Sequence, residues 1–147
     1  MDKGVAVALT AAVGGLIALQ APINSTLGKR VGTLPAASIS FAIGTVLLVL
    51  LALAFGGGFG KVGEVRSLSW VYLTGGILGA AYVTSVLVTV RTLGAGGVTA
   101  ATIAGQLTAA VVVDQLGALG LERNTITAPR LAGVALLAAG TFLVVRY

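Results

Sequence analysis

Five long apolar stretches fill almost the whole of this 147-residue chain. Each approaches or exceeds the ~20 apolar residues that a helix needs to cross ~30 Å of hydrocarbon. None has a polar face wide enough to meet water, which argues against a soluble domain with buried helices. We therefore expect an all-α integral membrane protein with a single domain over residues 1–147. Its five transmembrane helices are predicted at residues 4–27, 35–55, 68–90, 98–119 and 131–145.

The odd number of spans places the two ends of the chain on opposite sides of the membrane. Two copies inserted in opposite orientations would form a ten-helix assembly with inverted halves. Inverted halves are the architecture of many small-molecule transporters. The parity therefore favours a transporter subunit that works by alternating access as an antiparallel homodimer.

The positive charges are almost balanced between the two expected sides. Five lie with the N-terminus and the second and fourth loops: Lys3, Lys61, Arg66, Arg123 and Arg130. Four lie with the other loops and the C-terminus: Lys29, Arg30, Arg91 and Arg146. A clear excess is needed to fix an orientation. Two interpretations follow: the chain inserts both ways, or one strong loop or a partner protein sets its orientation.

The scarcity of charged and reactive residues excludes several classes of function. Only 9% of the residues are charged, and the chain has no cysteine and no histidine. Disulfides and thiolate metal sites are therefore absent, and the usual general base and commonest metal ligand are missing. We expect no enzyme activity, no metal and no cofactor. The basic residues lie mostly between apolar segments, so nucleic-acid binding is not expected either.

The N-terminal apolar run could be mistaken for a secretory signal peptide, because Lys3 precedes it. A signal peptide has an apolar region of about 7–15 residues followed by a small-residue cleavage site. Here the run reaches Gln20 without such a site, so we interpret it as the first transmembrane helix.

Gln106 lies near the midplane of the predicted fourth helix, ~12 Å from Val98 at ~1.5 Å per residue. Its neutral amide can donate and accept hydrogen bonds, which suits a substrate site. The alternative is a helix-to-helix hydrogen bond, worth under ~2 kcal/mol. The two interpretations have equal weight at this point.

Asp114 is the one acid within an apolar segment. It could carry a proton for coupled transport. However, it lies ~24 Å from Val98 at the same rise per residue, close to the far interface. Hydration or pairing with an arginine is therefore favoured. Arg91, at the end of the third helix, is interpreted as a topology charge rather than as an anion clamp.

A second polar cluster lies in the first helix. Gln20 and Asn24 share a helix face at i, i+4 spacing. Pro22 cannot donate a backbone hydrogen bond, which frees the carbonyl of Ala18. A broken helix with freed backbone groups is typical of transporter binding sites. A simple kink near a helix end is the alternative.

A small and polar stripe follows the third helix, where Tyr82, Ser85 and Thr89 have i, i+3, i+7 spacing. Such a stripe is expected to face the bundle interior or a cavity. The Tyr82 ring could stack on a cationic ligand, or it could be a packing residue.

The run at residues 18–24, which reads ALQAPIN, and the run at residues 104–107, which reads AGQL, resemble the YdcZ-type branch of the drug/metabolite transporter superfamily. The resemblance covers nearly the full chain. It implies a short inner-membrane exporter protein equivalent to half of a ten-helix transporter. Related small multidrug transporters use an acid in the first helix, and this helix has none.

We therefore predict a subunit of an inner-membrane exporter for a small polar or amphipathic solute. The predicted partners are membrane lipid, a small-molecule substrate and a second copy of the chain. The predicted substrate-binding residues are Gln20, Asn24, Tyr82, Ser85 and Gln106. The alternative is a non-transporting membrane scaffold or an accessory subunit of a larger complex.

Overall fold

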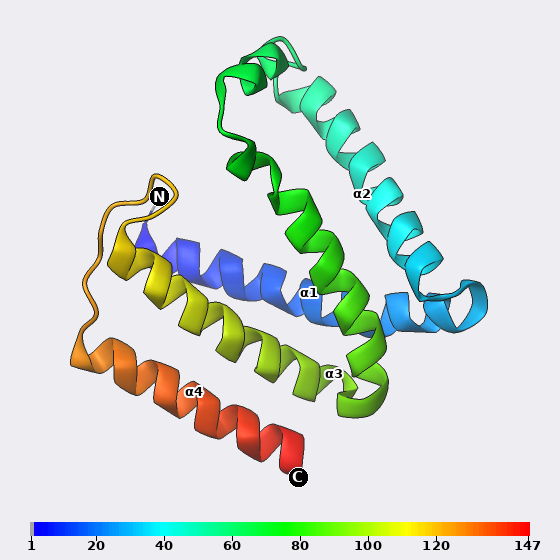
Figure 1. The fold of residues 1–147 in the computed structure, drawn as a ribbon. Coiled ribbons are helices and arrows are strands. Elements are labelled where there is room, and N and C mark those ends of the chain that lie inside the picture. The colour runs from blue at the N-terminus through cyan, green and yellow to red at the C-terminus, as the bar shows by residue number, and fades with distance from the viewer. Residues whose placement is uncertain (1) are drawn as a thin grey trace. The chain divides into compact units, whose positions relative to one another are not determined.

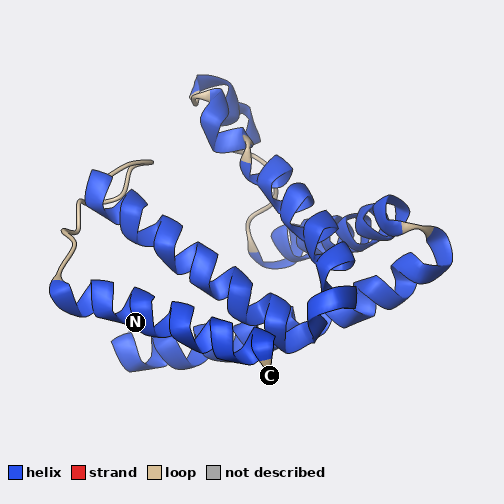
Figure 2. Cartoon of the chain, turned by 60° about the horizontal axis from the view of Figure 1, so that its bottom comes forward, coloured by secondary structure: helices blue, strands red, loops and turns tan. Residues whose placement is uncertain are grey.

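The computed structural model describes residues 2–147, and every regular element in that range is a helix (Figure 1). Loops connect the helices, and no strand occurs among these residues (Figure 2). The expected all-α class is thereby confirmed. In chain order the elements are the helices α1 (Lys3–Val31), α2 (Thr33–Phe55), η1 (Val62–Ser67), η2 (Trp70–Leu73), α3 (Gly75–Leu116) and α4 (Ala128–Arg146), of which η1 and η2 are 3-10 helices.

Helix α1 begins at an aspartate cap. The Asp2 carboxylate accepts hydrogen bonds from the backbone N–H groups of Gly4 and Val5, at 2.8 and 3.4 Å. These donors have no partner within the first helical turn, so the cap satisfies them. The helix then continues without interruption through Pro22 to Val31. The predicted break at Pro22 is therefore wrong, and the helix extends four residues beyond its predicted end at residue 27.

The extension places Lys29 and Arg30 inside the last turn of α1 rather than in a loop. Positive side chains are favourable there, because the unpaired carbonyls at a helix C-terminus carry partial negative charge. One residue, Gly32, then separates α1 from α2. Its φ of 94° lies in a region that glycine adopts without strain. Helix α2 consequently begins at Thr33, two residues before its predicted start.

The segment between α2 and α3 differs from the prediction in two ways. Val62–Ser67 forms η1 instead of a plain polar loop. The helix predicted from residue 68 begins only at Gly75, and before it a separate 3-10 turn, η2, contains Trp70 and Tyr72. These two aromatic side chains are 72% and 57% exposed. Exposed Trp and Tyr beside an apolar span are typical of membrane–water interfaces.

Four helical segments are long and apolar enough to cross a membrane: Lys3–Val31, Thr33–Phe55, Trp70–Leu116 and Ala128–Arg146. The third of these has 47 residues. At ~1.5 Å per residue it would measure about 70 Å, more than twice the ~30 Å of hydrocarbon in a bilayer. It therefore contains two spans.

The division between these two spans lies at Gly94, where α3 has non-helical dihedral angles, φ 68° and ψ 171°. This combination is essentially restricted to glycine. The break gives helical halves at residues 75–93 and 95–116, each close to one bilayer thickness. The loop expected from Arg91 to Gly97 is thus reduced to one residue, and Arg91 itself is helical. Together with α1, α2 and α4, these halves make about five membrane helices.

Helix α4 begins three residues before its predicted start. Thr127 is extended and precedes it, and a proline lies in its first turn, where a missing N–H costs no helical hydrogen bond. The helix ends at Arg146. The Arg146 guanidinium lies over the rings of Phe142 and Tyr147, at 5.5 and 5.8 Å from their centroids.

The chain forms two compact units, which are described separately. One comprises Leu19–Val88, and the other comprises the start of the chain up to Ala18 together with Thr89–Tyr147. We call them the Leu19–Val88 unit and the Thr89–Tyr147 unit. In the Leu19–Val88 unit a small core joins three helices, with Ala36, Ala37, Val83 and Leu87 buried and Leu27 and Tyr82 packed against them.

Candidate functional site

The core of the Leu19–Val88 unit depends on two alanines that bring α2 close to its neighbours. Ala36 is 0% exposed and Ala37 is 6% exposed. Small residues let membrane helices approach closely, because they leave little side-chain volume between the backbones. Leu87, on the first half of α3, is 1% exposed and fills this contact. The close approach also brings backbone carbonyls within reach of neighbouring side chains.

Two adjacent polar residues of α1 use this proximity to bind two different helices. Asn24 is 6% exposed, and its Nδ2 donates a hydrogen bond to the Ser40 hydroxyl on α2, at 3.1 Å. Ser25 is 5% exposed, and its hydroxyl donates to the Leu87 carbonyl on α3, at 3.4 Å. The three helices are therefore joined by neutral polar contacts as well as by the apolar core. Such contacts are worth roughly 0.6–2 kcal/mol each in membrane proteins.

The structure separates the predicted pair Gln20 and Asn24. Asn24 is buried and bonded to Ser40, whereas Gln20, one turn earlier, is exposed. Tyr82 is half-buried and packs against the same core that Asn24 borders. Ser85 is exposed, and its hydroxyl donates to the carbonyl of Ala81 in its own helix, at 2.8 Å. Of the four predicted site residues in this unit, two lie in the core contact and two face outward.

Gln106 belongs to the other unit, on the second half of α3. It is exposed, and its amide makes no hydrogen bond to the described residues of its own unit. It lies eleven residues after Ala95 and ten before Leu116, at the centre of its helical half. The observed helix boundaries therefore keep Gln106 at the centre of a span, and its midplane position stays a prediction.

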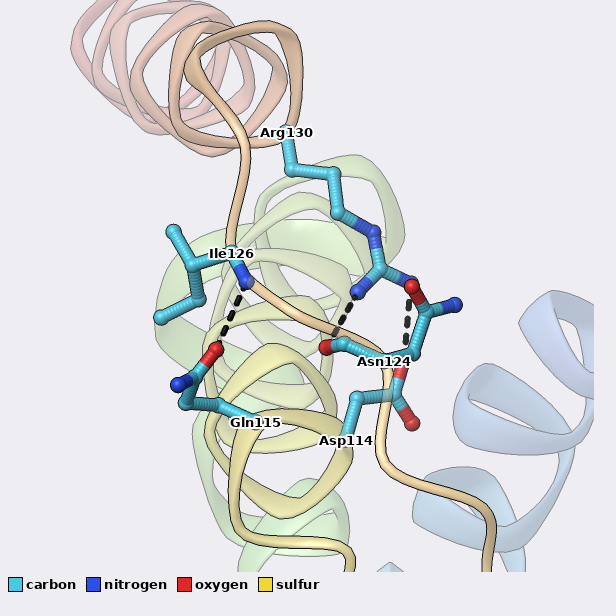
Figure 3. A network of polar contacts seen from close by, with 5 residues as sticks. All are labelled: Asp114, Gln115, Asn124, Ile126 and Arg130. Atoms are coloured by element: carbon cyan, nitrogen blue, oxygen red, sulfur yellow. Dashed lines mark hydrogen bonds and ion pairs between the residues drawn. The ribbon is translucent and has the colours of Figure 1, made fainter.

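Asp114 is ion-paired, and its partner is Arg130 near the start of α4. The Arg130 Nη2 lies 2.8 Å from the Asp114 Oδ2, with the two side chains 31% and 30% exposed. The other guanidinium nitrogen, Nη1, donates to the Asn124 carbonyl at 3.3 Å (Figure 3). One arginine thus connects the end of α3, the following loop and the beginning of α4.

Further hydrogen bonds fold the loop at residues 117–127 back onto the end of α3. The Gln115 side-chain oxygen accepts the backbone N–H of Ile126 at 2.7 Å (Figure 3). The Asp114 carbonyl accepts the backbone N–H of Asn124 at 2.8 Å. The Arg123 side chain donates to the Gln115 carbonyl at 3.0 Å. We call the ion pair and the hydrogen bonds within residues 114–130 the polar cap.

A glycine makes the polar cap possible. The N–H of Ala118 donates to the Val113 carbonyl, and the N–H of Gly117 donates to the Asp114 carbonyl. This pair of bonds is the Schellman arrangement, which requires a left-handed residue after the helix. Gly117 has φ 59°, and a Cβ added there would lie 3.1 Å from the Arg123 Cβ. The glycine therefore serves both the turn and the close approach of the loop.

Sequence reasoning missed most residues of these contacts, among them Ser25, Ser40 and Arg130. Ser25 and Ser40 gave no signal beyond being small polar residues within apolar runs. Arg130 carried a usable signal, because an arginine at the start of one helix and an acid at the end of the preceding helix face the same interface.

No group of three or more potential metal-ligating His, Cys, Asp or Glu side chains occurs within residues 2–147. The five predicted site residues are all neutral side chains. Neutral amides and hydroxyls can bind a polar solute by hydrogen bonds.

These features define a polytopic α-helical membrane protein with few, mostly neutral, polar groups inside its spans. The chain belongs to the family described as "Putative inner membrane exporter, YdcZ", whose sequence model matches residues 5–143. Searches of curated proteins and of solved structures give no match. The resemblance and the inner-membrane location are thereby confirmed. Membership of an exporter family indicates transport rather than catalysis.

Proposed function

We propose that the chain is a subunit of an exporter for a small polar or amphipathic organic solute, and that it works by alternating access as an antiparallel homodimer. Its family supports export across the inner membrane. The observation that carries the dimer is the break at Gly94, because it converts four long helices into five spans. Five spans put the two termini on opposite sides, so two oppositely inserted copies have inverted topology.

The charge distribution supports insertion in both orientations. Five positive residues are assigned to one side and four to the other. With such a small difference, the positive-inside effect gives little preference for either orientation.

The proposed solute contacts are Gln20, Asn24, Tyr82, Ser85 and Gln106. Three of them, Gln20, Ser85 and Gln106, are exposed on their helices. Asn24 already donates to Ser40, so a solute that binds Asn24 exchanges this hydrogen bond for one of its own.

Alternating access requires parts of the chain to move relative to one another, and two weak points in the backbone support this. Helices α1 and α3 both continue from one compact unit into the other. In α1 the boundary follows Ala18, whose carbonyl cannot receive a helical hydrogen bond from Pro22. In α3 the break at Gly94 lies six residues beyond Val88. Each connecting helix therefore has a missing or broken helical bond near the boundary.

Topology labelling tests the dimer. Because the chain has no cysteine, Asp2→Cys and Tyr147→Cys each introduce one unique thiol. Intact cells are labelled with a membrane-impermeant thiol reagent, and permeabilised cells give the total. We expect about half of the molecules of each variant to be labelled in intact cells. Full labelling of one variant and none of the other would exclude an antiparallel homodimer.

Transport is tested with Gln106→Ala, and Thr108→Ala serves as the matched control. Both residues are exposed and near the centre of the same helical half, but Thr108 bonds only to the Ala104 carbonyl of its own helix. In efflux-deficient cells challenged with a panel of organic compounds, the unaltered chain should raise tolerance to at least one. Gln106→Ala should lose that tolerance at normal abundance, and Thr108→Ala should retain it. Equal tolerance of both variants would remove Gln106 from the site, and no tolerance with any compound would favour the scaffold alternative.

A further inference from the structure

Gln106 combines three properties that no other residue of its helical half shares. It carries an amide, it is exposed, and it lies at the centre of residues 95–116. At ~1.5 Å per residue it is about 16 Å from Ala95 and 15 Å from Leu116, half the ~30 Å of a bilayer core. The amide therefore lies where water is scarcest.

An amide at this depth needs a hydrogen-bonding partner. Burial of such a group without a partner is destabilising, because it loses its hydrogen bonds to water. Among the described residues of its own unit, no side chain or backbone group bonds to it. Lipid tails offer neither donors nor acceptors. The partner therefore comes from outside the Thr89–Tyr147 unit.

The surroundings of Gln106 permit another helix to come close. A Cβ added at Gly105 would meet no atom within 4 Å, and Ala109 and Ala110 are small and exposed. Small residues at a helix contact allow the backbones of two membrane helices to approach. The neutral amide of Gln106 would then be within reach of a group on the approaching helix.

Symmetry identifies which group that is. In an antiparallel pair the two helices run in opposite directions. A residue that comes a few positions before the midplane residue therefore faces one that comes about as many positions after it in the partner. Only a residue at the midplane faces its own copy. A glutamine is suited to this position, because its amide is both donor and acceptor and so can bond to an identical amide.

We propose that Gln106 hydrogen-bonds to Gln106 of a second, antiparallel copy, so that each copy contributes one amide to a shared site at the membrane midplane. The proposal rests on the proposed function, and it adds the contact face and its register. A polar solute in the site would be held between two amides that are equivalent by symmetry.

The register makes the proposal testable through two exposed neighbours on the same helix face. Ile103 lies three residues before Gln106 and Ala110 four residues after it. In the antiparallel pair Ile103 of one copy faces Ala110 of the other. In a parallel pair each of these residues faces its own copy instead.

Oxidative cross-linking distinguishes these arrangements, because a disulfide requires Cβ atoms about 3.5–4.5 Å apart. We expect Gln106→Cys to form a dimer several-fold more efficiently than Thr108→Cys, an exposed control at similar depth on the opposite face. Ile103→Cys and Ala110→Cys should each fail to dimerise alone. The two variants, carrying different tags and produced together, should cross-link to each other.

Self-cross-linking at all three positions would show a parallel contact and overturn the proposal. Cross-linking at none of them, in a chain whose termini label on both sides, would overturn this contact face and leave the antiparallel transporter intact. Termini that label on one side only would remove both proposals.

Because Gln106→Cys itself deletes the amide, Gln106→Leu and Gln106→Asn provide a second measurement. Co-purification of differently tagged copies should fall several-fold with Gln106→Leu and be partly restored by Gln106→Asn. Unchanged co-purification of the leucine variant would show that the amide does not hold the copies together.

Discussion

The two compact units share one kind of polar contact and differ in another. Each has a neutral helix-to-helix hydrogen bond, since in the Thr89–Tyr147 unit the Thr141 hydroxyl on α4 donates to the Ala100 carbonyl on α3 at 3.0 Å, but among residues 2–147 only this unit adds a charged network. In the Leu19–Val88 unit, neutral side chains on α1 bond directly to neighbouring helices, and Asn24 and Ser25 are almost fully buried. In the Thr89–Tyr147 unit, the polar cap joins a loop to two helix ends through charged side chains that remain about 30% exposed. The difference indicates that depth selects the chemistry. Neutral groups hold helices together inside the membrane, and charged groups hold chain connections at its surface.

The largest expected effect in this comparison comes from Gly117→Ala in the polar cap. The substitution forces a left-handed residue with a side chain, at a cost of about 1–2 kcal/mol, and places a methyl group 3.1 Å from the Arg123 Cβ. We expect the free energy of unfolding to fall by at least that amount. The measurement is SDS titration in mixed micelles, followed by the fluorescence of the single tryptophan, Trp70.

Gly133→Ala is the control for this glycine. Gly133 is helical, and a Cβ added there meets no atom within 4 Å. The free energy of unfolding of the Gly133→Ala variant should be unchanged or slightly raised, because alanine favours the helix. Equal losses at both positions would mean that the turn at Gly117 is not a source of stability.

A double-mutant cycle on Asn24→Ala and Ser40→Ala should give the next largest effect. The two side chains share a buried hydrogen bond, so we expect a coupling energy of about 1 kcal/mol. Because both groups are neutral, the coupling should not change with salt concentration. A coupling that disappears in high salt would contradict the assignment of this contact to the membrane interior.

A smaller coupling is expected between Asp114 and Arg130, from the cycle of Asp114→Asn and Arg130→Gln. Partly exposed ion pairs contribute about 0.2–1 kcal/mol. Their attraction is screened by salt, so the coupling should decrease as the salt concentration rises. If it exceeded the Asn24–Ser40 coupling and resisted salt, the proposed difference between the two units would be reversed.

The smallest effect is expected from Gln115→Ala. The substitution removes the acceptor for the Ile126 N–H, but this loop is exposed and water can replace the bond. Global stability should change by less than about 0.5 kcal/mol. Hydrogen exchange at Ile126 should nevertheless become several-fold faster, and Glu122→Gln, in the same loop but outside the cap, should leave it unaltered.

The same contrast explains what the sequence could predict. Long apolar runs identify every span, because only hydrophobic length is needed for that. The connections were predicted less well, since dihedral angles at single glycines decide them. Gly94 replaces an expected seven-residue loop, and Gly32 replaces an expected gap from Leu27 to Pro35.

The candidate site was only partly predictable for a related reason. A helix that is apolar on all sides has no periodicity to show which face meets its neighbour. The bond from Asn24 to Ser40 therefore could not be foreseen, although the polar character of Asn24 was clear. Asp114 was placed near an interface from its depth alone, but its partner Arg130 depended on how the loop folds back.

The break at Gly94 also bears on how the chain is made. A single residue joins two consecutive spans, so both must be delivered to the bilayer as one piece during synthesis. The only charge close to that junction is Arg91, three residues earlier. On either face of the bilayer, the insertion machinery has to move only the Arg91 guanidinium with this junction. No soluble segment has to be moved with it. The junction itself therefore adds only one positive charge to the signals that orient the chain.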